Sequence, residues 1–362
     1  MTPERPLLTR LSPAPRKIAV VRASRLGDFI CATPALRALR AALPSAEIVM
    51  ITLPLLRDLV ARLPYIDRFV AFPGFPGIAQ QFFNPHEALA FFQHMQTERF
   101  DLALQLQGSG VYANPFTLLL GASATAGFVR AEDDASALAM SLVWPARGHE
   151  TERLLALMEH VGVGRLGNDL AFPLWQDDRD KAAQILARLP PPYIGVHAGS
   201  HDPYRRWPLE RFAAVARTLL RRYGGTVLVL GGIHESEQTL GLCAAIGPGA
   251  YNLAGRTSLG TLGAVIERLA LLISNDSGPA HIGYALSTPT VGIYRTGGAE
   301  RYGPASAGPF AALEPHLVDA ADPASGLVSI PQVLAAADRL LAQAHEEQMT
   351  WMPEEPSKES AE

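Results

Sequence analysis

Charged and hydroxyl side chains follow short apolar runs at four places in the chain. The first place is the turn 22–28 (RASRLGD), which carries Arg25 and Asp28 after the run 17–22. A carboxylate at this position could take a proton from a substrate hydroxyl as a general base, or it could merely cap the helix that follows. The turn lacks the three spaced glycines of a dinucleotide fingerprint, so it does not predict NAD binding.

The second place is the loop 197–208 (HAGSHDPYRRWP), which contains Ser200 and follows the apolar run 193–197. The loop offers backbone N–H groups, hydroxyl donors and the forked guanidinium groups of Arg205 and Arg206, all of which suit a diphosphate. Taken alone, the two arginines fit ordinary surface charge equally well.

The third place, 274–281 (SNDSGPAH), follows the most apolar run of the chain and opens a helix. The first N–H groups of a helix have no partner within it, so they can bind an anion. We expect Ser277 and Gly278 to cradle a phosphate there. Helix capping could instead explain Asp276 or Ser277, and a structural role could explain His281.

The fourth place is the segment 230–237 (LGGIHESE), in which Glu235 follows an apolar run and two glycines. The helix dipole favours an acid at this position whatever the function. A carboxylate after a strand in a nucleotide-binding lobe can instead accept hydrogen bonds from a ribose diol. Both interpretations of Glu235 remain open.

The elements that hold these segments alternate between short apolar runs and amphipathic stretches from residue 17 onward. That alternation is typical of βαβ units and a mostly parallel sheet. A chain of 362 residues exceeds one core and fits two, and the pattern weakens between residues 162 and 192. We therefore predict an α/β protein of two doubly wound lobes, with ligands in the cleft between them.

The individual elements follow from the periodicity of apolar residues. Strands are predicted at 17–22, 47–51, 68–72, 100–105, 193–197, 226–230, 270–274 and 290–294. Helices are predicted over 28–43, 55–63, 86–97, 149–161, 178–189, 208–223, 258–269 and 331–347, and from about 235 and 279. The apolar window 111–129 contains Asn, Pro and Gly, so we interpret it as a helix followed by a strand and not as a membrane span.

Composition excludes several classes of function. A formal charge of −4 and a pI near 6.2 give no bulk attraction for nucleic acid. Cys31 and Cys243 lie too far apart in sequence to indicate a disulfide framework or a metal cluster. The first 16 residues lack the apolar core of a secretory signal, so we expect a cytoplasmic protein.

The four segments, taken in their order along the chain, resemble glycosyltransferase family 9, the ADP-heptose:lipopolysaccharide heptosyltransferases. The likeness extends over about residues 17–345 and includes the stretch 252–259 (NLAGRTSL) and the turn 301–304 (RYGP). It implies the GT-B fold of two Rossmann-like lobes facing a cleft. The implied parts are an acceptor-binding lobe over 17–172, a nucleotide-sugar-binding lobe over 173–330, a helix over 331–348 that returns to the first lobe, and a disordered tail over 349–362.

The same resemblance implies roles for individual residues. It assigns Asp28 as the catalytic base and Arg205, where the family usually has lysine, as a contact to the donor phosphates. The implied donor-binding residues are Ser200, Arg205, Glu235, Asp276, Ser277, Gly278 and His281. We expect the acceptor near Arg25, Gln107 and Asn114, in the lobe where family members differ.

The predicted function is inverting transfer of a sugar, expected to be heptose from ADP-heptose, to a cell-envelope glycan or glycolipid such as the lipopolysaccharide core. We expect no metal and no other cofactor, and contact with the inner face of the membrane where the acceptor lies. A nucleotide-sugar epimerase or hydrolase of the same fold is the alternative. A catalytically silent sugar-nucleotide-binding protein is disfavoured by Asp28.

Overall fold

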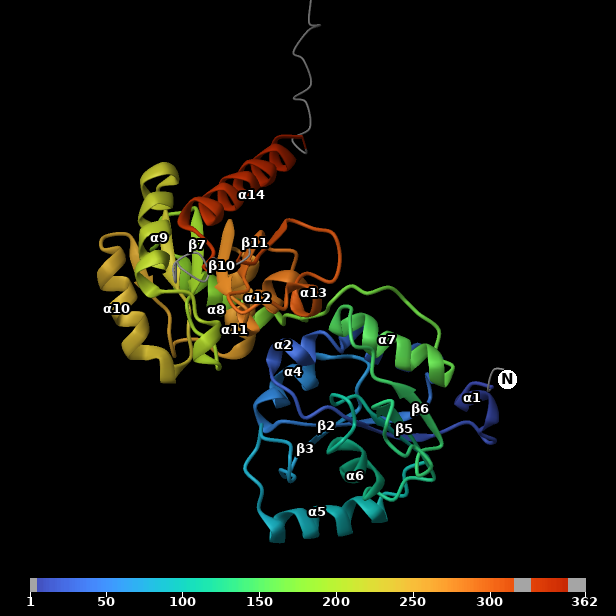
Figure 1. The fold of residues 1–362 in the computed structure, drawn as a ribbon. Helices are drawn as coiled ribbons and strands as arrows, with labels where there is room; N and C mark the ends of the chain where they lie inside the picture. Colours follow the sequence, from blue (N-terminus) through green and yellow to red (C-terminus); the bar gives the residue numbers. More distant parts are fainter. Residues whose placement is uncertain (1–4, 316–326, 351–362) are drawn as a thin grey trace, which may run out of the picture.

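Two parallel six-stranded sheets dominate the computed structural model, which describes residues 5–315 and 327–350 (Figure 1). The strand order is β3-β2-β1-β4-β5-β6 in the first sheet and β12-β11-β10-β7-β8-β9 in the second. Counted from its own first strand, each sheet has the doubly wound order 3-2-1-4-5-6, which creates a ligand-binding switch point beside the first strand. The predicted α/β class with two doubly wound lobes is confirmed.

The first lobe comprises the first sheet and the helices around it. Its strands are β1 (Lys17–Val21), β2 (Glu47–Thr52), β3 (Arg68–Ala71), β4 (Leu102–Gln105), β5 (Ala124–Val129) and β6 (Met140–Val143). Its helices are α1 (Leu7–Arg10), α2 (Leu26–Ile30), α3 (Thr33–Ala42), η1 (Pro54–Leu56), α4 (Arg57–Arg62), α5 (Pro85–Thr97), α6 (Ala113–Leu118) and α7 (Glu150–Val161). The short elements α1 and β6 were not predicted from the sequence.

The second lobe comprises the second sheet and its helices. Its strands are β7 (Tyr193–His197), β8 (Thr226–Val229), β9 (Ala250–Asn252), β10 (Leu271–Asn275), β11 (Thr290–Ile293) and β12 (Phe310–Leu313). Its helices are α8 (Gln176–Leu186), η2 (Pro203–Arg205), α9 (Leu209–Tyr223), η3 (Ile233–Glu235), α10 (Ser236–Ile246), α11 (Leu259–Glu267), α12 (Gly278–Ala285), α13 (Ala299–Tyr302) and α14 (Ile330–Thr350). The sequence did not predict β9, β12 or α13, which have three or four residues each.

The central strands of both sheets are buried along almost their whole length because helices cover both of their faces. All five residues of β10 are buried, as are four of the five residues of β1. A fully covered strand reads as a continuous apolar run in the sequence, which is why these strands could be predicted. The apolar window 111–129 forms α6 and β5, as expected. Among the described residues, no helix has the length and apolarity needed to cross a membrane.

The predicted helix 28–43 is two helices, α2 and α3, separated at Cys31 and Ala32. Pro34 lies in the first turn of α3, where its missing N–H costs nothing. In a continuous helix the Pro34 ring would clash with the carbonyl of Ile30 four residues earlier. The break therefore leaves α2 as a short helix of five residues after the turn 22–28.

The expected return of the last helix to the first lobe is wrong for the described residues. Val333, Ala337 and Leu340 of α14 are buried in the apolar core of the second lobe, together with residues of α9, β10 and β11. Figure 1 shows α14 on the side of the second lobe that lies away from the first lobe. Of the expected tail 349–362, residues 349 and 350 belong to α14, and the rest lies outside the described residues.

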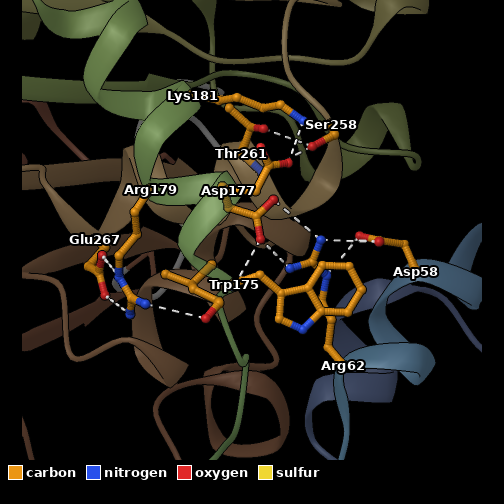
Figure 2. A network of polar contacts seen from close by, with 11 residues as sticks. Asp58, Arg62, Trp175, Asp177, Arg179, Lys181, Ser258, Thr261 and Glu267 are labelled. Atoms are coloured by element: carbon orange, nitrogen blue, oxygen red, sulfur yellow. Dashed lines mark hydrogen bonds and ion pairs between the residues drawn. The ribbon is translucent and has the colours of Figure 1, made fainter.

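Instead, the lobes meet through α2 against α12 and through α4 against α11. Arg62 of α4 is almost fully buried at this junction, with only 3% of its side chain exposed. Its guanidinium pairs with Asp58 of its own helix and with Asp178 of α8, and it lies 4.0 Å from the centre of the Trp175 ring (Figure 2). Arg62 thus joins the first lobe to the segment that begins the second.

An ion cluster lies at the edge of the first sheet where the strands begin, opposite the edge where they end. Glu98 pairs there with Lys17 of β1 and with Arg68 of β3. Hydrogen bonds from Arg68 and Lys17 lower the pKa of Glu98 to about 2, against an ordinary value of 4.5. This edge faces away from the carboxyl ends of the strands, so the cluster serves the fold and not the cleft.

Candidate active site

A cleft of about 570 Å³ lies between the lobes. It is bordered by the turns that follow β1, β7 and β10, so the predicted segments 22–28, 197–208 and 274–281 all contribute to it, as does Glu235. Residues of both lobes line the cleft, among them Ser24, Arg25, Asp28, Gln107, Glu150, His197, Ser200, Arg205, Glu235, Asp276, Ser277, Gly278, His281, Arg301 and Tyr302. The structure therefore brings together side chains that lie more than 250 residues apart in the sequence.

Asp28 projects from the first turn of α2 and lines the cleft. The N-cap of α2 is Arg25 and not Asp28, so the interpretation of Asp28 as a simple helix cap does not hold. The Asp28 backbone carbonyl accepts hydrogen bonds from Arg22 Nε (3.0 Å) and Nη2 (2.8 Å), and no described residue donates one to its carboxylate. The carboxylate can therefore accept a hydrogen bond from a ligand.

A buried ion pair between Arg22 and Glu150 stabilises the turn 22–28, which carries Asp28. Arg22, with 2% of its side chain exposed, lies 3.0 Å from Glu150 at the start of α7. Arg301 of the second lobe reaches the other oxygen of the same carboxylate at 2.9 Å. Burial by itself would raise the pKa of Glu150, but the two arginines hold it below its ordinary value. Glu150 therefore stays charged and joins the turn that carries Asp28 to the second lobe.

The N-terminus of α12 forms the opposite wall of the cleft. No described residue accepts a hydrogen bond from the backbone N–H of Ser277 or Gly278. A Cβ atom on Gly278 would lie 2.8 Å from Leu26 Cδ2 in α2, so a larger residue there would require the Leu26 side chain to move. Unpaired N–H groups at a helix start suit a phosphate group.

Two cationic side chains flank this helix start, and Asp276 holds both. Its carboxylate lies 2.8 Å from Arg205 Nη1 and 3.8 Å from His281 Nε2. Burial disfavours the charged form of His281, but the neighbouring Cys31 sulfur and the Asp276 carboxylate raise its pKa above the ordinary value. The wall of the cleft therefore combines two cations with a helix N-terminus, as the binding of a diphosphate requires.

The loop 198–207 is fixed to the end of β10 through Asn275. The Asn275 side-chain oxygen accepts a hydrogen bond from the backbone N–H of Trp207 at 3.0 Å. Its amide nitrogen donates one to the Ala198 carbonyl at 2.8 Å. Arg206 donates to the Ser200 carbonyl at 2.9 Å, while the Ser200 hydroxyl donates to the Asp276 carbonyl at 3.4 Å. Arg206 thus fixes the loop, whereas Arg205 faces the cleft.

Glu235 is the last residue of the helical turn η3 and the N-cap of α10, so it lies at a helix start, as the dipole argument expected. Its Oε2 accepts the Gly232 N–H at 2.7 Å and lies 3.6 Å from His197 Nε2. The nearby His197 ring is the main cause that lowers the pKa of Glu235. The carboxylate also borders the cleft, so the ribose interpretation stays a prediction.

Two of the three residues expected to bind the acceptor border the cleft. Arg25 Nη2 lies 2.8 Å from His201 Nε2 across the cleft. Gln107 also lines the cleft, although its side-chain oxygen is buried and accepts no hydrogen bond from a described residue. Asn114 instead donates to the Phe128 carbonyl at 2.8 Å, inside the first lobe. The structure therefore does not bring Asn114 into the cleft.

Comparison with protein-family models matches residues 88–314 to glycosyltransferase family 9 (heptosyltransferase). The chain belongs to glycosyltransferase family 9. Lipopolysaccharide heptosyltransferase 2 of Escherichia coli K12 is 28% identical over 298 residues, which is 77% of this chain and 82% of that protein. The Salmonella typhimurium protein of the same name is 27% identical over 295 residues, with 77% and 82% covered.

Solved structures of family 9 proteins share the fold. The crystal structure of a family 9 glycosyltransferase from Veillonella parvula superposes with a TM-score of 0.79 at 24% identity, covering 91% of this chain and 98% of that one. E. coli ADP-heptose lipopolysaccharide heptosyltransferase II gives a TM-score of 0.73 at 24% identity, covering 91% and 99%. The GT-B fold and the glycosyltransferase class implied by the sequence are confirmed.

The cleft of this family 9 glycosyltransferase also holds residues that the sequence analysis did not single out. One of them is His197, the last residue of β7. Its Nδ1 atom lies 2.9 Å from the hydroxyl oxygen of Ser277. A polar residue that ends a buried strand is a usable signal, and it could have indicated His197. Arg301 stands in the turn 301–304 that carries part of the resemblance, but no local signal indicates its contact with Glu150, which depends on how the lobes meet. Within residues 5–315 and 327–350, no group of three His, Cys, Asp or Glu side chains is placed to hold a metal ion.

Proposed function

We propose that this chain transfers a heptose, with inversion, from ADP-heptose to an acceptor sugar of the lipopolysaccharide core. One observation carries the proposal: the Asp28 carboxylate of the first lobe shares a cleft with the anion site that Arg205, His281 and the start of α12 form in the second lobe. A base and a site for a leaving diphosphate are the two parts that direct displacement at an anomeric carbon needs. The names of the relatives supply heptose and lipopolysaccharide as the substrate classes.

In the proposed reaction, Asp28 takes the proton from an acceptor hydroxyl as that oxygen bonds to the anomeric carbon. The bond from this carbon to the phosphate oxygen breaks on the opposite face, and the nucleoside diphosphate leaves with the bonding electron pair. General-base assistance of this kind contributes about 10²- to 10⁴-fold. Because the base belongs to the first lobe, the acceptor must bind on that side.

Negative charge that develops on the diphosphate would be met by groups already in position. Arg205 and His281 supply positive charge, and the N–H groups of Ser277 and Gly278 supply donors. Asp276 keeps both cations in place before the ligand arrives. Such preorganised groups stabilise a transition state without the cost of reorganising solvent. We assign Ser200 and Glu235 to the donor side as well, since both border the cleft.

The proposed division of labour follows the lobes. The first lobe, residues 17–172, would bind the acceptor with Arg25 and Gln107, and the second lobe, residues 173–330, would bind the donor. The acceptor is a glycolipid under this proposal, so the enzyme would act in the cytoplasm at the inner face of the membrane.

Purified protein incubated with ADP-heptose, with and without lipopolysaccharide core that lacks the added heptose, tests the proposal. We expect ADP release and incorporation of heptose only when the acceptor is present. Free heptose released at the same rate without acceptor would favour the hydrolase alternative, and an altered nucleotide sugar would favour the epimerase. Parallel reactions with UDP- and GDP-sugars measure the preference for the nucleotide.

A further inference from the structure

The hydroxyl of Ser277 does not perform the task that its position suggests. Ser277 is the N-cap of α12, where a serine side chain ordinarily accepts a hydrogen bond from the second or third helical N–H. Here Pro279 has no N–H, and the Ala280 N–H bonds to the Ser277 carbonyl. The hydroxyl instead lies 2.9 Å from Nδ1 of His197.

His197 is enclosed between Ser277 and Glu235. Only 7% of its side chain is exposed, and its Nε2 lies 3.6 Å from Glu235 Oε2. Gly199 makes this arrangement possible, because a Cβ atom there would lie 1.7 Å from Glu235 Oε1 and 3.0 Å from His197 Nε2. A carboxylate, an imidazole and a hydroxyl thus follow one another toward the helix start that faces the cleft.

The single proton of the Ser277 hydroxyl has several possible acceptors. Ser277 Oγ lies 3.1 Å from the Asn275 carbonyl and 3.1 Å from the Ser274 hydroxyl, which itself donates to that carbonyl at 2.8 Å. A neutral His197 with its proton on Nε2 accepts the Ser277 proton at Nδ1. A protonated His197 donates from Nδ1 to Ser277 Oγ, which leaves the hydroxyl proton for a phosphate oxygen.

We propose that Glu235, His197 and Ser277 form a proton-linked relay that turns the Ser277 hydroxyl toward the donor diphosphate. When the diphosphate binds, His197 takes one proton from solvent at Nδ1, pairs as an imidazolium with Glu235, and donates to Ser277 Oγ. The Ser277 hydroxyl then donates to a phosphate oxygen. His197 is a positioning residue in this scheme, and the scheme rests on the proposed function because it requires a nucleoside diphosphate beside Ser277.

Other charges around the relay are already paired or held by the loop. Arg206 acts on Glu235 through its charge and donates to the Ser200 carbonyl, while Asp276 pairs with Arg205. Glu235 is thus the acid that contacts the imidazole directly. Proton uptake on binding of the diphosphate should therefore depend on His197 and also on the hydroxyl of Ser277.

Calorimetric titration with ADP at pH 7, in two buffers of different ionisation enthalpy, counts the protons taken up per ADP bound. We expect wild type to take up as much as about one proton more than His197→Asn, in which the amide occupies the Nδ1 position but cannot ionise. Ser277→Ala should lose the same uptake although His197 is still present, and its affinity for ADP should fall about 10- to 100-fold. His234→Asn, at an exposed neighbour of Glu235, should behave as wild type.

Each alternative gives a different result. Uptake that persists in Ser277→Ala would show that His197 responds directly to phosphate charge, and it would overturn the relay. Equal uptake by wild type and His197→Asn would also overturn the relay while leaving the proposed function intact. A wild-type protein that binds none of ADP, GDP and UDP would overturn the proposed function and the relay together. Thermal melts of each variant confirm that the compared proteins are folded.

Discussion

Asp28→Asn removes the charge of the proposed base and keeps its size and its place in α2. The structure limits what this change can do to the fold, because the N-cap of α2 is Arg25 and no described residue donates a hydrogen bond to the Asp28 carboxylate. What remains is the attraction of the carboxylate to the helix start, about 0.3 to 1 kcal/mol, and to the charge of Arg22, which Glu150 already pairs. The melting temperature should therefore fall by less than about 4 °C.

Catalysis should respond on a different scale. Loss of a general base lowers the rate by at least about 10²-fold and up to about 10⁴-fold, which corresponds to about 2.7 to 5.4 kcal/mol of transition-state stabilisation. ADP should bind no more weakly to the Asn variant than to wild type, since the change removes a negative charge from the cleft that would receive the diphosphate. The expected pattern is thus a large loss of rate with binding and folding retained.

Initial rates of heptose transfer at saturating donor and acceptor, measured beside thermal melts, provide the assay. Glu210→Gln is the matched control, because Glu210 is an exposed acid in the first turn of α9 and is not among the cleft-lining residues. A rate for Asp28→Asn within tenfold of wild type would refute the assignment of Asp28 as the base. A large loss of stability would refute the structural argument.

Arg205→Ala is expected to weaken ADP binding by about 1.5 to 3 kcal/mol and Arg205→Lys to preserve most of it, and equal calorimetric affinities of wild type and the Ala variant would contradict the assignment. Glu150→Gln leaves the buried Arg22 without its counter-charge, so urea denaturation should show a loss of about 3 to 5 kcal/mol, and an unchanged midpoint would count against this ion pair. The pKa of Glu98 is lower in the folded protein, about 2 against 4.5, so its contribution to stability is present above pH 4.5 and is lost as the pH falls toward 2. Glu98→Gln should therefore flatten the acid limb of stability measured by denaturation, and an identical limb would be the contrary result. Transfer should persist in EDTA because Arg205 and the start of α12 supply the charge compensation, whereas complete loss restored by Mg²⁺ would reveal a metal requirement.

Much of the cleft could be predicted because its residues follow buried strands directly. Asp28 and Ser277 come after runs that are apolar on both faces, and the carboxyl ends of parallel strands gather at one edge of a sheet. The strand positions and the site at that edge thus come from one local pattern. The break between α2 and α3 was also readable from Pro34, but the apolar periodicity on both sides of it obscured the signal.

Contacts between the lobes could not be read in this way. Glu150 meets Arg301, and Cys31 lies 3.7 Å from His281, only because two separately folded lobes dock in one orientation. The position of α14 could not be predicted for the same reason, since an apolar stripe does not indicate which lobe it covers, and here it packs on the second. Asn114 was expected to bind the acceptor because it is a polar residue in the first lobe, where family members differ. Its side chain instead donates a hydrogen bond to the Phe128 carbonyl inside that lobe, which the sequence does not indicate.

The Arg62 contact limits how the lobes of this enzyme could be exchanged with those of other family 9 enzymes. A chimera that exchanged the first lobe to alter acceptor choice would bring a new residue to the position of Arg62, opposite Asp178 and Trp175. Gly260 of α11 adds a second constraint on the exchanged lobe. A Cβ atom at residue 260 would lie 2.3 Å from Arg62 Nη2, so a larger residue there would displace the guanidinium. A crossover point between Trp175 and Asp178 would take the two residues that contact Arg62 from different parent enzymes. Exchanged segments should therefore carry the residues that pair with Arg62 as one unit.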